Sequence, residues 1–264
     1  MNMAQVPSAA ATAPIARGMR AGLVQREDDL PTLSGLHPFE PLAADEVDLW
    51  MVPLPLEPQI ESSLAEALSP EERHRAARFA VPGAGRQFIA GRAVLRRLLG
   101  HYLGLPPQAL HFSLGAMGKP ALAEVRALSF NLSHTEGLLL VAVASGMEVG
   151  DDVEKVRPIE GAAHLAARYF TARERAGMED RPDAFLRLWT CRESAVKASG
   201  LGVSEGWDAL RIVERGRDEA QAVGLGGDCF VRLFSPCSGY VAALAAMAPG
   251  FRIRRRETLD LTSG

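Results

Sequence analysis

Three carboxylates lie within four positions of the segment VGDDVE, residues 149–154, directly after a strongly apolar run. Side chains of a strand alternate between its two faces, so Asp152 and Glu154 are predicted to share one face while Asp151 points to the other. Two carboxylates on one face could bind a hard cation such as Mg²⁺, because this ion prefers oxygen ligands. A solvated strand end or turn is the alternative interpretation, and this segment alone leaves both open.

A helix with a second set of reactive side chains is predicted for the segment LWTCRESAVKASG, residues 188–200. Trp189, Glu193 and Lys197 are spaced by four residues and therefore lie along one stripe of that helix. Glu193 could complete an oxygen shell begun by Asp152 and Glu154, since Mg²⁺ takes about six oxygen ligands, including waters and phosphates. The alternative is a surface pair of Glu193 and Lys197, which would contribute only a few tenths of a kcal/mol.

The elements that must position these residues begin with a predicted strand at 47–54. A helix follows at SPEERHRAARF, where Ser69 is the predicted N-cap and Glu72 completes a capping box. The next predicted helix, residues 86–104, has apolar residues at helical spacing and ends at Gly104. The remaining elements of this part are strands joined by turns, at 109–122 and 128–145.

The same order of strand, long helix and antiparallel strands recurs after residue 148. The predicted elements there are strands 148–155, 210–214, 229–234 and 239–248, and helices 164–170, 171–177 and 183–200. We predict an α+β fold of two similar halves in a pseudo-two-fold arrangement, each a small antiparallel sheet packed on a long helix. The cleft between the halves is the expected ligand site. The predicted parts are a mobile extension (1–40), the halves (41–147 and 148–252) and a frayed tail (253–264).

Composition narrows the class of protein. A net charge of −3 over 264 residues gives no basic excess that would favour nucleic acid or an anionic membrane surface. The apolar runs are far shorter than the ~20 residues of a spanning helix, and no signal peptide is expected. Three cysteines without paired spacing, Cys191, Cys229 and Cys237, favour free thiols and a reduced, cytoplasmic setting. We expect a cytoplasmic monomer.

The two chemical segments together resemble a known family. VGDDVEK and WTCRESAVK, residues 149–155 and 189–197, are similar to the two signature motifs of the 4′-phosphopantetheinyl transferases, in particular the larger monomeric type that activates surfactin synthetase. Further similar stretches occur in the family's order: SPEERHRAARF, AGRAVLRRLLG, GKP and FNLSH. The resemblance implies two similar α+β halves with coenzyme A between them.

The resemblance also assigns roles to individual residues. It implies magnesium binding by Asp152, Glu154 and Glu193, and catalytic roles for Glu193 and Lys197. The implied coenzyme A contacts are Arg75, Arg86, Gly118, Lys119, Ser133, His134, Asp152 and Lys197. Cationic side chains suit the phosphates of coenzyme A, and His134, expected in a loop after a strand, could donate to a phosphate oxygen.

Two positions depart from the family's pattern. Arg192 stands where the family has lysine, which preserves the charge but changes the hydrogen-bonding geometry. Asp151 stands where the family has an aliphatic residue. Because it should face away from the cation, we expect its side chain to be solvated or paired with a cation, and the sequence assigns it no function.

The implied reaction is magnesium-dependent transfer of 4′-phosphopantetheine from coenzyme A to a serine of an apo acyl or peptidyl carrier domain, with release of 3′,5′-ADP. Glu193 would take the serine proton, directly or through a water, and Lys197 would stabilise or protonate the departing ADP. The alternatives are a magnesium-dependent nucleotide pyrophosphohydrolase and a non-catalytic module that binds coenzyme A or a carrier protein. The predicted carrier platform is the helical region 162–178, with Arg168, Arg173 and Arg175 as contacts. No motif identifies the carrier that is modified.

Overall fold

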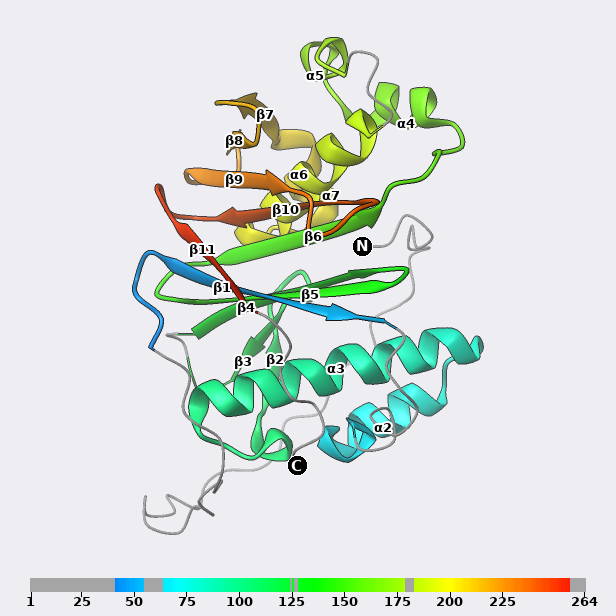
Figure 1. Ribbon diagram of the computed structural model, residues 1–264, viewed down its shortest axis with the longest axis vertical. Coiled ribbons are helices and arrows are strands. Elements are labelled where there is room, and N and C mark those ends of the chain that lie inside the picture. The colour runs from blue at the N-terminus through cyan, green and yellow to red at the C-terminus, as the bar shows by residue number, and fades with distance from the viewer. Residues whose placement is uncertain (1–40, 55–63, 124, 126–127, 179–182, 257–264) are drawn as a thin grey trace.

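The computed structural model describes residues 41–54, 64–123, 125, 128–178 and 183–256. The predicted extension, 1–40, and residues 257–264 of the predicted tail lie outside these ranges. The fold is α+β, as predicted, with two facing sheets between outer layers of helices (Figure 1). Its pseudo-two-fold symmetry stays a prediction.

The first part of the chain supplies helices α2 and α3 and one side of the molecule. Its elements are β1 (Glu46–Pro53), the 3₁₀ turn η2 (Ala65–Ala67), α2 (Pro70–Ala77), α3 (Pro82–Leu103), the 3₁₀ turn η3 (Pro107–Ala109), β2 (Phe112–Leu114), β3 (Pro120–Leu122), β4 (Leu128–Thr135) and β5 (Leu138–Ser145). The capping box of Ser69 and Glu72 is present at the start of α2. Gly104 ends α3 with φ +64°, a left-handed conformation that glycine adopts without steric cost.

The second part supplies the other sheet with its helices, and it adds one strand, β11, to the first sheet. Its elements are β6 (Val149–Lys155), α4 (Ala162–Tyr169), α5 (Ala172–Ala176), α6 (Ala184–Ser199), α7 (Gly202–Ala209), β7 (Arg211–Glu214), β8 (Glu219–Val223), β9 (Cys229–Phe234), β10 (Tyr240–Ala246) and β11 (Arg252–Arg256). Of these, α7, β8 and β11 were not predicted from the pattern. Among the described helices, none combines the length and apolar character that crossing a membrane requires.

Two sheets organise these strands. One has the order β11-β1-β5-β4 and the other β6-β10-β9-β8-β7, while β2 and β3 form a separate hairpin. The prediction of a frayed tail from residue 253 is wrong for residues 253–256, because they belong to β11, which pairs in parallel with β1. The first sheet is therefore mixed rather than purely antiparallel.

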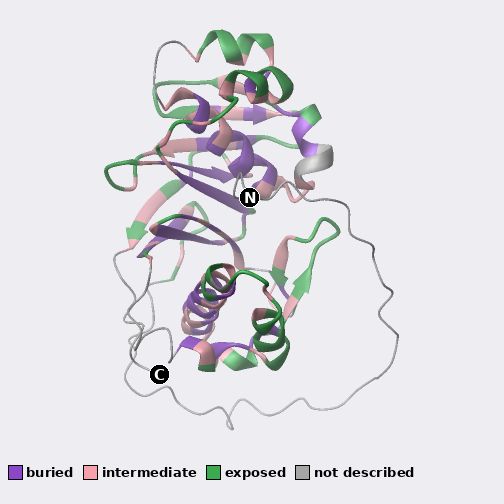
Figure 2. Cartoon of the chain, turned by 90° about the vertical axis from the view of Figure 1, so that its right-hand side faces the viewer, coloured by how far each residue is buried: buried purple, intermediate pink, exposed green. Residues whose placement is uncertain are grey.

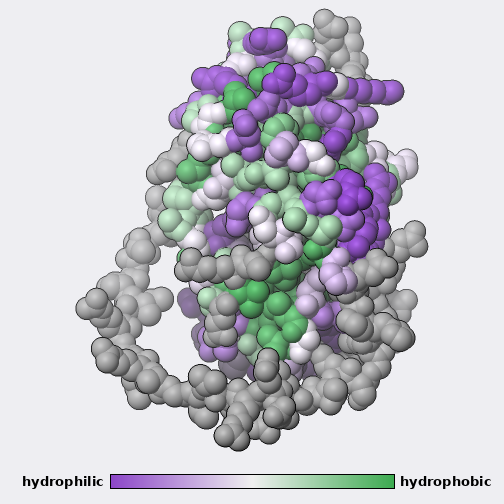
Figure 3. All heavy atoms as spheres, turned by 90° about the vertical axis from the view of Figure 1, so that its left-hand side faces the viewer, coloured by the Kyte–Doolittle hydropathy of each residue, from purple (hydrophilic) through white to green (hydrophobic). Residues whose placement is uncertain are grey.

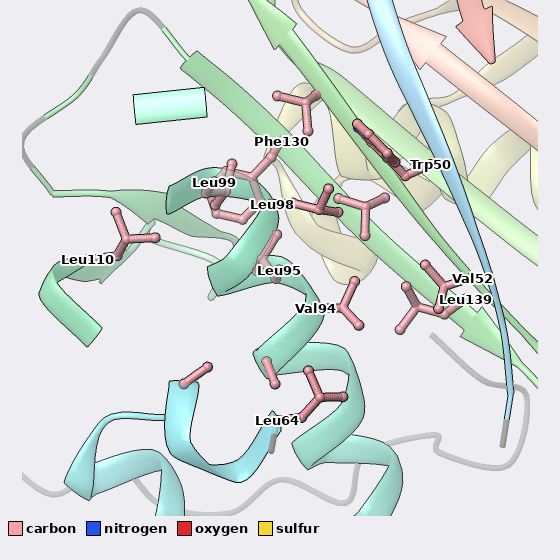
Figure 4. Close-up of a cluster of buried hydrophobic side chains, with 14 of the residues drawn as sticks. Trp50, Val52, Leu64, Val94, Leu95, Leu98, Leu99, Leu110, Phe130 and Leu139 are labelled. Atoms are coloured by element: carbon pink, nitrogen blue, oxygen red, sulfur yellow. The ribbon is translucent and has the colours of Figure 1, made fainter. Parts of the chain in front are cut away.

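Three apolar layers hold the molecule together. On the outer face of the first sheet, leucines of α3 such as Leu95, Leu98 and Leu99 pack against Trp50 and Phe130 (Figure 4). Between the sheets, alternating apolar residues of β1 and β5 meet those of β6 and β10. On the outer face of the second sheet, α6 packs against β9 and β10. Buried residues are accordingly concentrated in the sheets and the facing sides of the long helices (Figure 2).

Candidate active site

The site is built where α6 crosses β6. A Cβ atom on Gly150 would lie 2.2 Å from the Ser194 carbonyl oxygen and 2.4 Å from the Ala198 amide nitrogen, so only glycine lets the helix lie directly on this strand. Because of this close approach, the side chains of β6 that follow Gly150 on the same face point toward the stripe of α6 that carries Glu193 and Lys197.

Lys197 links the strand and the helix. Its Nζ atom donates to Asp152 Oδ1 at 2.7 Å and to the Asp151 carbonyl oxygen at 3.1 Å. Glu193 Oε2 lies 3.9 Å from the same ammonium group. Glu193 and Lys197 are therefore not an exposed surface pair, since Glu193 is only 1% exposed and its neighbour Asp152 only 3%.

Three buried carboxylates, those of Asp152, Glu154 and Glu193, lie around the crossing of β6 and α6, where Lys197 lies beside Asp152 and Glu193. Glu154 is 2% exposed, and its Oε2 atom has no hydrogen-bond partner among the described residues, with Arg157 Nη2 at 3.5 Å. Burial and the neighbouring charge of Asp152 raise the pKa of Glu154 to about 7. Burial also raises the pKa of Glu193 despite the nearby Lys197. The pKa of Lys197 is raised, because Asp152, Glu193 and Asp151 outweigh the effect of its burial.

This donor chemistry fits a hard divalent cation. Three buried carboxylates repel one another unless positive charge is supplied, and oxygen donors are the ligands that Mg²⁺ prefers. In the described part of the chain, no three histidine, cysteine, aspartate or glutamate side chains form a preassembled metal cluster. One oxygen of Asp152 is instead held by Lys197. A cation would therefore add to an existing ion pair.

Lys119 lies beside the first residues of β6. Its Nζ atom donates to Glu148 Oε2 at 2.7 Å and to the Val149 carbonyl oxygen at 3.0 Å. The turn that carries it, between β2 and β3, needs Gly118 at φ +82°, which a residue with a side chain rarely adopts. The hairpin thus brings a lysine from the first part of the chain to the strand that carries the carboxylates.

His134 lies within β4, so the prediction that it occupies a loop after a strand is wrong. Its Nδ1 atom is 2.9 Å from Nε2 of Gln87 on α3, a partner that no sequence motif indicates. Burial is the main cause that lowers the pKa of His134, and the charge of Lys197 contributes. Gln87 could not be predicted from the sequence as a partner of His134, because the contact depends on how α3 packs against β4.

Arg75 and Arg86 lie near the α2–α3 corner and are exposed. The guanidinium of Arg75 stacks over the ring of Phe88, 5.0 Å from its centroid. Arg86 lines a largely apolar cavity of about 310 Å³ together with Leu68 and Ile89. Neither arginine is held against the β6 carboxylates by a hydrogen bond within the described residues.

Asp151 does not behave as predicted. The expectation that it is solvated or paired with a cation is wrong, because its side chain is fully buried between the sheets and its carboxylate accepts a hydrogen bond from the Ser133 hydroxyl. Burial is the main cause that raises the pKa of Asp151 to about 6. Ser133, a predicted phosphate contact, is itself 5% exposed.

Arg192, the other departure from the family pattern, is buried beside Glu193. Its Nη1 atom lies 2.8 Å from Glu174 Oε1, and its Nη2 atom donates to the Trp207 carbonyl oxygen at 2.7 Å. Glu174 also caps α5 through a reciprocal pair of hydrogen bonds with Thr171. The sequence signal for this partner was the T-x-x-E pattern at 171–174.

The three arginines of the predicted carrier platform, Arg168, Arg173 and Arg175, are all exposed. Arg175 donates to the carbonyl oxygens of Ala167 and Phe170, so it ties α4 to α5. Arg168 is exposed and stacks on Tyr169, and Arg173 is exposed at the mouth of a cavity of about 570 Å³ between α5, α6 and β7. Hydrophilic side chains gather at this end of the molecule (Figure 3).

The chain is similar to known proteins along most of its length. A family model described as the 4′-phosphopantetheinyl transferase superfamily matches residues 148–245, and one described as 4′-phosphopantetheinyl transferase, N-terminal, matches residues 54–147. The 4′-phosphopantetheinyl transferase HetI of Nostoc sp. (strain PCC 7120) is 41% identical over 172 residues, which cover 62% of this chain and 73% of that protein. Sfp of Bacillus subtilis (strain 168) is 25% identical over 204 residues, covering 75% and 90% of the two chains, and psf-1 of Bacillus pumilus is 29% identical over 198 residues, covering 72% and 83%. The chain therefore belongs to the 4′-phosphopantetheinyl transferase family of enzymes.

Proposed function

We propose that this enzyme transfers 4′-phosphopantetheine from coenzyme A to a serine of an apo acyl or peptidyl carrier domain and releases 3′,5′-ADP. The observation that supports this most directly is the contact of Lys197 with Asp152, beside Glu193 and the unsatisfied carboxylate oxygen of Glu154. A buried excess of negative charge next to a lysine suits a substrate that arrives as a complex of a polyphosphate and a divalent cation.

The chain's own residues divide the chemistry between them. The serine Oγ attacks the pyrophosphate phosphorus next to the pantetheine, and the bond from that phosphorus to the bridging oxygen of the ADP leaving group breaks. Glu193 accepts the proton of the serine hydroxyl, directly or through a water, since it is the carboxylate that lies one helical turn from Lys197. Lys197 holds a phosphate oxygen and stabilises the charge that develops on the departing 3′,5′-ADP.

Mg²⁺ would be held by Asp152, Glu154 and Glu193. When bound, it would neutralise phosphate charge and the charge developing on the leaving group. Coenzyme A phosphates would also meet Lys119 and His134, and Arg75 and Arg86 would reach them from the α2–α3 corner with their long side chains.

The carrier domain would dock on the helical region 162–178. Arg168, Arg173 and Arg175 are the proposed contacts for an acidic partner, because all three are exposed. Arg175 is left with less freedom to meet a partner, since its guanidinium already holds two carbonyl oxygens.

One assay tests the function against both alternatives. The protein is incubated with coenzyme A, Mg²⁺ and an apo carrier protein, and the carrier is weighed by intact mass spectrometry while coenzyme A is followed by chromatography. Transfer adds one phosphopantetheine to the carrier. A pyrophosphohydrolase would consume coenzyme A and leave the carrier unchanged, and a binding module would change neither. A carrier whose acceptor serine is replaced by alanine is the matched control.

A further inference from the structure

The edge strands β4 and β6 are joined through side chains rather than through a shared backbone ladder. Every second residue of β4 from 129 to 135 is polar and faces β6. We call these residues the polar seam: Ser129, Asn131, Ser133 and Thr135. Sheet edges expose unpaired backbone groups, and such groups need partners when they are buried.

Each member of the polar seam makes a hydrogen bond to β6 or to the residues before it. Asn131 Oδ1 accepts from the Asp151 amide at 3.1 Å, and Thr135 Oγ1 accepts from the Lys155 amide at 3.4 Å. The Ser129 hydroxyl donates to the Met147 carbonyl oxygen. Among the described residues, Ser133 is the one member of the polar seam that bonds to a side chain, the carboxylate of Asp151.

The position of Ser133 conflicts with a role as phosphate donor. A serine hydroxyl carries one proton, and here it is donated to Asp151 Oδ2. Ionised phosphate oxygens only accept hydrogen bonds, so the same hydroxyl cannot serve both. Strand alternation places Ser133 opposite Leu140 in the layer between the sheets, the layer that also holds the Asp151 carboxylate, whereas His134 faces α3 and Gln87.

We propose that Asp151 captures the Ser133 hydroxyl and makes this serine a positioning residue of the polar seam instead of a contact for coenzyme A. An aliphatic residue at position 151, as in the family's pattern, has no acceptor and would leave the hydroxyl available to a ligand. Asp151 thereby ties β4 to the strand that carries Asp152 and Glu154. This inference rests on the proposed function insofar as coenzyme A is the ligand.

A double-mutant cycle in the full chain tests it, with Asp151→Val, Ser133→Ala and the pair combined. Coenzyme A affinity is measured by titration calorimetry, and kcat and KM for coenzyme A by transfer assay. We expect Ser133→Ala to change coenzyme A affinity by less than about twofold in the wild-type background, but to weaken it about tenfold in the Asp151→Val background. An equal loss in both backgrounds would overturn the proposal.

Asp151→Asn is the matched control, because it removes the charge and keeps an oxygen that accepts from Ser133. In this background Ser133→Ala should again have an effect of less than about twofold. A tenfold loss of coenzyme A affinity in the Asp151→Asn background would show that the charge of Asp151, and not its hydrogen bond to Ser133, decides whether Ser133 contacts the ligand. That result would refute the inference.

The unfolding midpoints of the same variants in urea provide a readout that needs no ligand. Asp151→Val and Ser133→Ala should be non-additive, since either change alone removes the shared hydrogen bond. Additive effects would show that the two side chains are not coupled, and would count against the proposal. A wild-type protein that binds no coenzyme A would instead refute the proposed function. The unfolding measurements would still show whether Ser133 and Asp151 are coupled by a hydrogen bond.

Discussion

Two groups of buried carboxylates in this molecule meet opposite electrostatic environments. Asp48 on β1 is fully buried and accepts hydrogen bonds from Arg254 Nε at 2.6 Å, from Arg256 Nε at 3.0 Å and from the Tyr102 hydroxyl. Burial alone would raise the pKa of Asp48, but these three donors outweigh it and lower the pKa. Two cations thus surround one carboxylate.

At the crossing of β6 and α6 the ratio is reversed. Lys197 lies beside Asp152 and Glu193, Arg157 lies 3.5 Å from Glu154, and burial still raises the pKa values of Glu154 and Glu193. Burial by itself therefore does not set the direction in which the pKa of a carboxylate shifts in this molecule. A compensated carboxylate such as Asp48 stabilises the fold, whereas an under-compensated group retains affinity for an additional cation.

The largest expected effect comes from Asp152→Ala. This change removes a proposed cation ligand and the partner of Lys197, so it should lower the transfer rate roughly a hundredfold or more while the protein remains folded. Transfer is measured by intact mass of the carrier over a range of Mg²⁺ concentrations, and folding by circular dichroism. Normal turnover at limiting Mg²⁺ would show that Asp152, like Asp48, has only a structural role.

Glu193→Gln and Lys197→Ala should fail in different ways. Glu193→Gln removes the base and one negative charge, so kcat should fall by a factor of roughly 10 to 100. Coenzyme A affinity should change little, and a higher Mg²⁺ concentration should be needed to saturate the enzyme. Lys197→Ala should lower kcat and also weaken coenzyme A binding roughly tenfold, because a cation beside the phosphates is lost. Kinetics and calorimetry at several Mg²⁺ concentrations measure both. Unaltered turnover in either variant would contradict the assigned roles.

Asp48→Asn should lower stability without lowering transfer. We expect a loss of roughly 2 kcal/mol in the free energy of unfolding at pH 7, because Arg254 and Arg256 lose their shared anion. The folded pKa of Asp48 is lowered, so its stabilisation is present above the unfolded pKa of about 3.9 and is lost as the pH falls through the folded value. Urea unfolding of both proteins from pH 7 to pH 3 should show the difference shrinking only in the acid range.

The smallest expected effect is a gain in stability. Glu154→Gln should raise the free energy of unfolding by about 1 kcal/mol at pH 8 without Mg²⁺, since it removes an under-compensated buried charge. The pKa of Glu154 is raised to about 7, so its ionisation opposes folding increasingly as the pH rises from about 4.5 through that value. The gain should disappear below pH 4.5. Thermal melts with and without Mg²⁺ measure it, and a loss of stability at pH 8 would contradict the proposed charge imbalance.

Local sequence patterns determined much of this molecule. The period of two in VGDDVEK separated Asp151 from Asp152 and Glu154, and the spacing of four in α6 aligned Glu193 with Lys197. Ser69 and Glu72 defined the start of α2, and Gly104 the end of α3. These features follow from the geometry of one helix or one strand, so residues close in the chain suffice to predict them.

Only the tertiary structure decided which surfaces meet. Arg254 reaches Asp48 across 206 positions, and the short strand β11 carried no sign in its own residues that it would pair with β1. The contact of Gln87 with His134 and that of Ser133 with Asp151 likewise join different elements. Strand alternation placed Asp151 on the opposite face from Asp152, but whether that face met solvent or another sheet depended on long-range packing. Periodicity fixes the direction of a side chain relative to its own element, whereas its partner is set by the burial of apolar surface between elements far apart in the chain.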